Sequence, residues 1–154
     1  LHCSKKEAEE RLEQDRMVIQ FTVPGEPKGK GRPRLGRSGH AYTPHDTAQY
    51  ENLVKVCFTE AVPDYQAMDC EVWVDIVAFY KIPKSVSKKK ALDMAMGFIR
   101  PMKKPDLDNI AKIICDSLNG IAYGDDSQVT KLTVRKYYAA EPRVEVKIGY
   151  ATGE

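Results

Sequence analysis

Apolar residues follow a strand period in four stretches of the chain. Residues 18–23 are rich in β-branched and aromatic side chains and stop at a Pro-Gly pair, which predicts a first strand. In residues 72–80 both alternating sets contain apolar side chains, as is typical of a strand in the centre of a sheet. Residues 128–138 predict a third strand. Residues 143–150 alternate apolar with charged side chains and predict a fourth strand with one solvated face.

Helical spacing accounts for most of the remaining apolar residues. One helix is predicted to begin at Asp46 or Thr47, either of which can cap it, and to end at Pro63. A second helix is predicted to begin near Ser85 and to run towards Gly97. The strongest pattern lies between residue 108 and an Asn-Gly stop at 119–120. Its apolar stripe consists of Ile110, Ile113, Ile114 and Leu118.

The order of the main elements, β-α-β-α-β-β with one short additional helix, predicts the fold class. We expect an α+β fold, a single domain with a mixed β-sheet and the main helices packed on one face. The length of 154 residues and a hydrophobic content of 42% suit one domain. Residues 1–16 are polar and are predicted to be an N-terminal extension to a domain formed by residues 17–154.

Compartment and cysteine chemistry follow from what the sequence lacks. Its longest apolar runs are far shorter than a membrane span, and no signal peptide opens it, so we expect a cytoplasmic protein without a membrane partner. In that reducing compartment cysteines stay reduced, and no pair has the CxxC spacing of a metal site. The thiols expected to be free are those of Cys3, Cys57, Cys70 and Cys115.

Charge is nearly balanced in total but segregated along the chain. A net charge of +2 argues, by itself, against an obvious nucleic-acid-binding protein. Residues 24–44, however, hold five basic side chains against one acidic, and residues 81–104 hold eight against one. Flexible basic loops of this kind can follow phosphates, so phosphate contact is predicted, above all for residues 29–34, although a solvated surface is the ordinary role of any single lysine. The candidate residues for contact with a nucleic-acid backbone such as that of DNA are Lys28, Lys30, Arg32, Arg34, Lys88, Lys89, Lys103 and Lys104.

A nucleotide-binding loop is excluded in the first basic region. The glycines of residues 25–31 do not have the G-x-x-x-x-G-K-[ST] spacing, and no hydroxyl residue follows Lys30. We therefore expect no nucleotide cofactor.

Carboxylates crowd around the strongest helix. Asp106 and Asp108 project to the same side of an extended approach, and Mg²⁺ is the common means of holding two such carboxylates together. Lys112 falls on the face of Asp108, and the pair Asp125-Asp126 follows the helix. Taken singly, these residues are ordinary as a helix cap, a surface ion pair and a turn. Taken together, beside basic loops, they indicate metal-assisted phosphodiester hydrolysis.

The order of these residues resembles a known signature. Lys104-Pro-Asp-Leu-Asp-Asn109, then Lys112, then Asp116-Ser-Leu-Asn-Gly120, then Asp125-Asp126-Ser-Gln-Val129 is similar to the central block of the RusA family of Holliday-junction resolvases. The upstream stretches 28–34, 42–44 and 83–85 agree in order, and the resemblance spans residues 18 to about 150.

The resemblance implies a homodimeric, Mg²⁺-dependent endonuclease that nicks two opposed strands of a four-way DNA junction. Its metal-binding carboxylates fall on Asp106, Asp108 and Asp126, with Asp125 as the alternative to Asp126, and its essential lysine on Lys112. Mn²⁺ is the expected substitute for Mg²⁺. The products implied have 5′-phosphate and 3′-hydroxyl ends. Such proteins are bacterial or phage-encoded, which implies a nucleoid-associated location.

Two alternatives stay open at the level of the sequence. One is a metal nuclease acting on flaps, forks or duplex DNA, and the other is a non-catalytic DNA-binding accessory protein. Exposed aromatic residues stack on bases in some DNA-binding proteins, but core or sheet packing is the expected role here. The residues concerned are Trp73, Phe98, Tyr137 and Tyr138.

Overall fold

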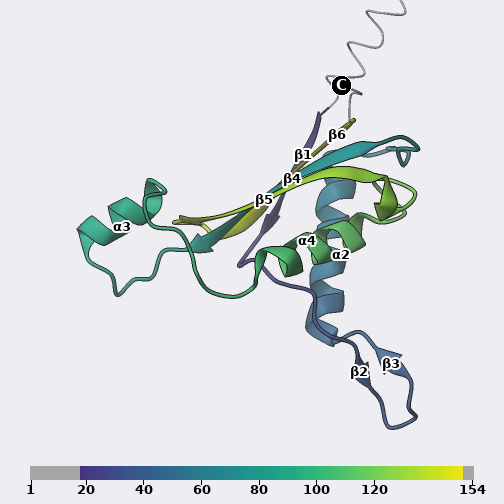
Figure 1. The fold of residues 1–154 in the computed structure, drawn as a ribbon, viewed down its shortest axis with the longest axis horizontal. Helices are drawn as coiled ribbons and strands as arrows, with labels where there is room; N and C mark the ends of the chain where they lie inside the picture. The colour runs from purple at the N-terminus through teal and green to yellow at the C-terminus, as the bar shows by residue number, and fades with distance from the viewer. Residues whose placement is uncertain (1–17, 151–154) are drawn as a thin grey trace, which may run out of the picture.

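A mixed four-stranded sheet forms the centre of the protein (Figure 1). The structure, a computed structural model, describes residues 18–150, so the predicted extension at 1–16 and Cys3 lie outside the described residues. The sheet has the strand order β1-β6-β4-β5. Its strands are β1 (Val18–Pro24), β4 (Val72–Lys81), β5 (Val129–Ala139) and β6 (Arg143–Tyr150).

Strand directions make the sheet mixed, as predicted. β4 runs parallel to β5, whereas β6 is antiparallel to both of its neighbours, β1 and β4. A parallel neighbour requires a crossover connection, and here that connection is the long segment between β4 and β5. The last strand of the chain is therefore inserted between the first strand and the rest of the sheet.

Two helices, α2 (His45–Ala61) and α4 (Leu107–Leu118), cover one face of the sheet, as expected (Figure 1). β1 buries every second residue against them, and β4 buries one alternating set completely. Most of the largest fully buried side chains come from the sheet and from α4. Together with Val54 of α2 and Tyr123 they form one apolar core. Those from the sheet and α4 include Ile76, Tyr80, Ile148, Ile110, Ile113, Ile114 and Leu118.

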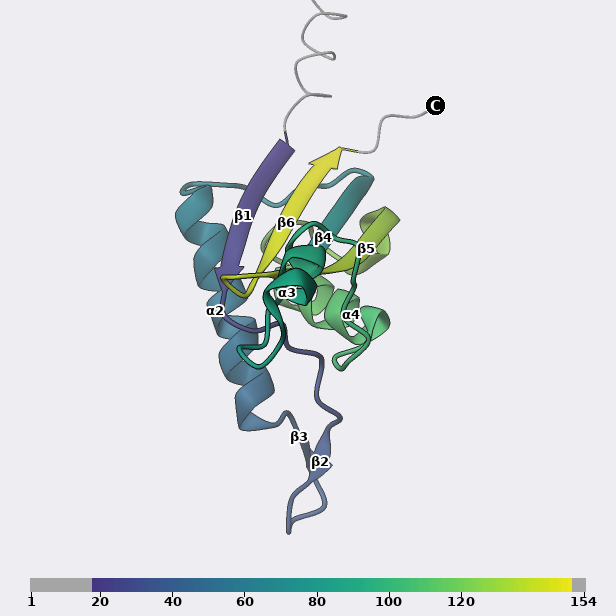
Figure 2. The ribbon, with the colours of Figure 1, turned by 90° about the vertical axis from the view of Figure 1, so that its left-hand side faces the viewer.

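Two short features extend beyond this core. The helix α3 (Lys88–Ala95) lies past the end of the sheet, where Ser87 caps it by accepting a hydrogen bond from the backbone of Lys90 at 3.2 Å (Figure 1). The hairpin of β2 (Arg34–Leu35) and β3 (Ala41–Tyr42) reaches beyond the start of α2 (Figure 2). The sequence predicted only a loop there, because strands of two residues are too short to show a period.

The predicted start of the first helix was wrong in detail. The helix begins at His45 with Pro44 as its N-cap residue, and Thr47 is buried within the first turns instead of capping them. The other element boundaries agree with the sequence to within a few residues. Cys57, Cys70 and Cys115 are free, as expected. Over residues 18–150, no helix is long and apolar enough to cross a bilayer.

Candidate functional site

The start of α4 presents the first two candidate carboxylates to solvent. Asp106 is the N-cap residue, and its carbonyl accepts the first helical hydrogen bond, from Ile110 at 3.0 Å, while its carboxylate makes no capping bond. Asp108 lies in the first turn and Lys112 one turn later, and both are exposed. Since the opposite side of α4 is buried in the core, the helix fixes the direction in which this exposed face points.

The connection that leads into α4 is held by the sheet. The hydroxyl of Tyr80, on β4, donates to the carbonyl of Pro105 at 2.9 Å. Lys136, on β5, donates from its ammonium group to the carbonyl of Lys103 and lies over the Tyr80 ring, 5.0 Å from its centroid. Burial, with Glu26 and Asp106 nearby, raises the pKa of Tyr80 to about 12, so the hydroxyl stays protonated and donates.

Lys136 is a site residue that sequence reasoning missed. Its pKa is lowered by burial, the charge of Asp106 opposes that shift, and Lys103 adds to it, so these charges interact with one another. The sequence did contain a signal. Lys136 occupies an inward position of β5 between Val134 and Tyr138, which pack against the core, and a charged residue at such a position needs a local explanation.

The first basic loop, residues 28–34, lies directly beside the start of α4. The backbone N–H of Lys30 donates to the carbonyl of Asn109 at 3.3 Å, and that of Gly31 donates to the Thr47 hydroxyl at 3.1 Å. Residue 29 must be small, because a Cβ there would lie 2.9 Å from the Cβ of Pro105. The loop is thus fixed between the N-terminal ends of α2 and α4.

Within this loop Lys30 differs from its basic neighbours. Its ammonium group forms ion pairs with Glu51 at 2.5 Å and with Asp116 at 3.1 Å. Burial lowers the pKa of Lys30, but the two carboxylates outweigh that effect and the net shift is upward. The sequence predicted Lys30 at the DNA surface, whereas here its charge joins the loop to α2 and α4. The exposed basic residues of this loop are Lys28, Arg32 and Arg34.

The second basic segment leads along the chain into the same helix. Lys88 and Lys89 begin α3, and Lys103 and Lys104 immediately precede the cis peptide bond to Pro105. All four lysines are exposed. In the part of the chain that the structure describes, none of them is ion-paired with a carboxylate. Unpaired positive charge therefore lies on the segment that leads into α4 as well as on the loop beside its start.

The later acidic pair divides into two roles. Asp125 caps the short 3₁₀ helix η1 (Asp126–Gln128): its carboxylate accepts from the backbone of Ser127 at 3.3 Å, and the Gln128 side chain accepts from its backbone at 2.9 Å. Hydrogen bonds from the Ser127 side chain and backbone lower the pKa of Asp125. Asp126 is exposed, and its charge raises the pKa of the Cys115 thiol, where burial is the larger cause. This places Asp126 near the C-terminal half of α4.

The predicted three-carboxylate cluster is not assembled. Among residues 18–150, no three acidic, histidine or cysteine side chains lie close enough together to hold a metal ion. The donor chemistry nevertheless suits Mg²⁺, which takes one or two carboxylates and keeps several waters. Asp106 and Asp108 provide that pair, and the carboxylate of Asp106 is available because its helix does not use it as a cap.

Comparison with known proteins decides the family. The family profile described as endodeoxyribonuclease RusA matches residues 24–149, which include α4, η1 and both basic segments. The chain belongs to the RusA family. This RusA protein is also similar to a protein of Bacillus subtilis (strain 168) named "Uncharacterized protein YqaN". The two are 42% identical over 135 residues, covering 84% of this chain and 94% of the relative.

Membership of the RusA family gives the site its coarse function, that of an endodeoxyribonuclease. The expectation drawn from the central block of the sequence is thereby confirmed at the level of the family. The first residues of that block, Asp106, Asp108 and Lys112, lie on the exposed face at the start of α4.

Proposed function

We propose that the protein is a Mg²⁺-dependent, structure-specific endonuclease that resolves four-way DNA junctions by paired phosphodiester hydrolysis, in DNA recombination and repair. The observation that carries the proposal is the start of α4. There, the carboxylates of Asp106 and Asp108 are exposed, the basic loop 28–34 lies beside the helix, and the exposed Lys103 and Lys104 directly precede it in the chain. A duplex lying across α4 would bring its phosphates to the basic residues and one phosphodiester bond to the carboxylates.

Asp106 and Asp108 would hold the ion, and Asp126 would join them from η1. When bound, the ion supplies Lewis-acid activation of the phosphate and lowers the pKa of a coordinated water. Lys112, one helical turn from Asp108 on the same exposed face, orients the attacking water or offsets the charge that develops on the phosphate. Asp125 keeps its structural role at η1.

DNA binding rests on contacts to the backbone and on junction shape. The exposed residues Lys28, Arg32 and Arg34 of the loop beside α4 neutralise phosphates, and so do Lys103 and Lys104 of the segment that leads into it. Lys30 orients the first of these segments through its two ion pairs. Such contacts distinguish branched DNA by the positions of its phosphates and leave its sequence largely unread.

Two opposed nicks call for two active sites. A four-way junction has two-fold symmetry, and an isologous homodimer presents two equivalent sites to it. We therefore propose a homodimer in which each subunit nicks one strand. Mass photometry of the protein alone and on a junction tests this assembly, and a single subunit per junction contradicts it.

Replacing Asp108 by Asn tests the proposed chemistry, because the substitution removes a charge with little change in volume. Mg²⁺-dependent nicking of a four-way junction is expected to fall by about two orders of magnitude or more. Binding of the junction, measured by gel shift without divalent ions, is expected to stay within about twofold. Asp69→Asn, an exposed aspartate outside the site, is the matched control. Undiminished nicking by Asp108→Asn contradicts the assignment.

Metal binding has its own readout. Mn²⁺ titration followed by electron paramagnetic resonance is expected to show weaker binding to Asp106→Asn than to the Asp69→Asn control. Equal Mn²⁺ binding by the two variants removes Asp106 from the metal site. A parallel cleavage panel of four-way junctions, forks, flaps and linear duplex separates the proposed substrate from the alternatives. DNA binding without any Mg²⁺-dependent nick indicates a non-catalytic accessory protein.

A further inference from the structure

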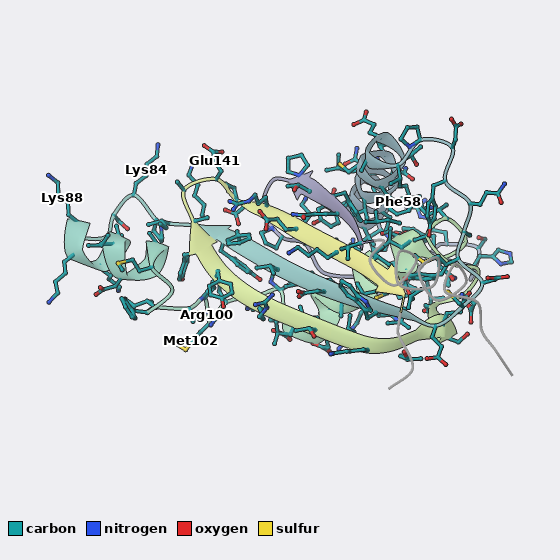
Figure 3. The ribbon with its side chains drawn as sticks, turned by 90° about the horizontal axis from the view of Figure 1, so that it is seen from above. Phe58, Lys84, Lys88, Arg100, Met102 and Glu141 are labelled. Carbon is teal, nitrogen blue, oxygen red and sulfur yellow. The ribbon has the colours of Figure 1, made fainter. Side chains whose placement is uncertain are left out.

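The segment between β4 and α4, residues 81–104, forms an arm that extends past the end of the sheet, as the labelled Lys84 and Lys88 show (Figure 3). Its eight basic residues stand against one acidic residue, Asp93. Within the described residues none of these eight cations is ion-paired with a carboxylate. Charge of this density, left unpaired, indicates a polyanionic partner.

The arm also exposes large apolar side chains. Phe98 is 74% exposed and Met102 is 97% exposed, and Leu92 and Met96 are exposed as well. The expectation that Phe98 packs in the core or on the sheet was wrong, because Met94 takes the packing position and is 4% exposed. Leaving four such side chains in water has a cost that a partner surface removes.

The arm is anchored at the point where these side chains emerge. Gly97 lies against Tyr137, whose ring carbon would be 3.4 Å from a Cβ at residue 97. The Arg100 guanidinium stacks on the same ring at 3.7 Å from its centroid, and its Nε donates to the carbonyl of Lys136. Phe98 and Met102 each lie two residues from Arg100, so they project from a fixed base.

Of the four aromatic residues considered for base stacking, Phe98, on the arm, is the one whose ring is exposed enough to stack on a base. Tyr137 is half-buried beneath Arg100, Tyr138 packs against the core, and Trp73 is half-buried against Gly149. Among these four, Phe98 has the exposed ring, and cations lie along the same segment. An unstacked nucleobase offers a flat π face next to negatively charged backbone phosphates, and proteins bind such a base by stacking it on an aromatic ring.

We propose that Phe98 and Met102 contact unstacked bases at the branch point of a DNA junction while the arm's cations hold the flanking phosphates. This inference rests on the proposed function, because it takes branched DNA as the ligand. The arm runs directly into the connection that precedes Asp106, through Lys103 and Lys104. A base held by Phe98 would thereby have a defined position relative to the carboxylates of Asp106 and Asp108, because the short segment between them is anchored to the sheet.

The test uses a four-way junction with 2-aminopurine at the branch point, bound in the absence of divalent ions so that no cleavage takes place. Phe98→Ala is expected to lower junction affinity about tenfold and to abolish most of the fluorescence change that the wild type produces. Met102→Ala is expected to act in the same direction with a smaller effect. Binding of a perfect linear duplex is expected to stay unchanged. Val56→Ala on α2, 52% exposed in the wild type, is the matched control.

An equal loss of affinity for junction and duplex overturns the inference, because the arm then binds any DNA. So does unchanged junction binding by Phe98→Ala. If the wild type binds vesicles of anionic phospholipid and Phe98→Ala loses that binding while DNA binding stays intact, the arm binds a membrane surface and the inference is overturned. Because the assay needs no nicking, its result is independent of the Asp108→Asn experiment, so failure of the proposed cleavage chemistry and failure of this inference can be told apart.

Discussion

Lys30, in the basic loop of residues 28–34, stabilises the fold through ion pairs. Its ammonium group lies between Glu51 of α2 and Asp116 of α4, and its side chain is 21% exposed. One residue thus joins the basic loop to both helices that cover the sheet. Because Lys30 is held in this way, the exposed residues on either side of it, Lys28 and Arg32, have a defined position.

Removing this charge is expected to destabilise the protein in a pH-dependent way. Lys30→Met leaves two carboxylates without their partner and is expected to cost about 1 to 2 kcal/mol at neutral pH. Because the folded state raises the pKa of Lys30 above 10.5, the contribution is fully present below that value and is lost as pH rises through the folded-state value.

The measurement is the free energy of unfolding in urea, for wild type and variant, from about pH 7 to about pH 11. The difference between the two is expected to shrink at the alkaline end. Lys55→Met, a lysine exposed in the C-terminal half of α2, is the control and is expected to show little difference at any pH. A constant difference for Lys30→Met contradicts the ionic role.

At the scale of elements, periodicity predicted what the core requires. The stripe of α4 and the alternation of β1, β4 and β6 were readable, because burial forces these patterns into the sequence. The hairpin β2–β3 and the outward turn at Phe98 were not, since neither buries a repeating face. The Lys136 contact and the ion pairs of Lys30 join residues far apart in sequence, so no local motif records them.

The hydrogen bond that holds the connection before α4 to the sheet can be tested by substitution. Tyr80→Phe removes only the hydroxyl that donates to Pro105, and the absence of this hydrogen bond is expected to cost about 1 kcal/mol. Nicking is expected to fall further than stability explains, because Asp106 follows directly. Junction binding is expected to change little.

Tyr65→Phe provides the matched control for this experiment. It removes a hydroxyl that donates to the carbonyl of Ala122 at 3.1 Å, far from Asp106 in sequence. A positioning role for Tyr80 is supported if both variants lose a similar free energy of unfolding but only Tyr80→Phe loses nicking activity. Equal nicking by both variants removes that role.

For the whole molecule, the distribution of charge matters more than its sum. A net charge of +2 conceals two basic segments and an acidic pair, Asp106 and Asp108, at the exposed start of α4. The sequence alone showed this segregation. What it did not show is that the basic loop is held against Asn109 and Thr47, which brings charge of both signs to one place.

Arg32→Ala combined with Arg34→Ala is expected to weaken junction binding and to flatten its dependence on salt. For every phosphate that the variant no longer neutralises, the slope of log affinity against log salt is expected to become shallower by about 0.9. Fluorescence anisotropy at several salt concentrations measures this slope, with Lys55→Ala as the control. A slope equal to that of the wild type removes both arginines from the DNA interface.

The position of β6 has a consequence for how the chain acquires its structure. In the described part of the protein, β1 pairs with the sheet only through β6, which comes last in sequence. As a nascent chain leaves the ribosome, β1 therefore has no neighbour to pair with until residues 143–150 emerge. The sheet can therefore close only once β6 is available to pair with both β1 and β4. Of the four strands of the sheet, β1 waits longest for its partner, so a chaperone that shields unpaired strands would act longest on β1.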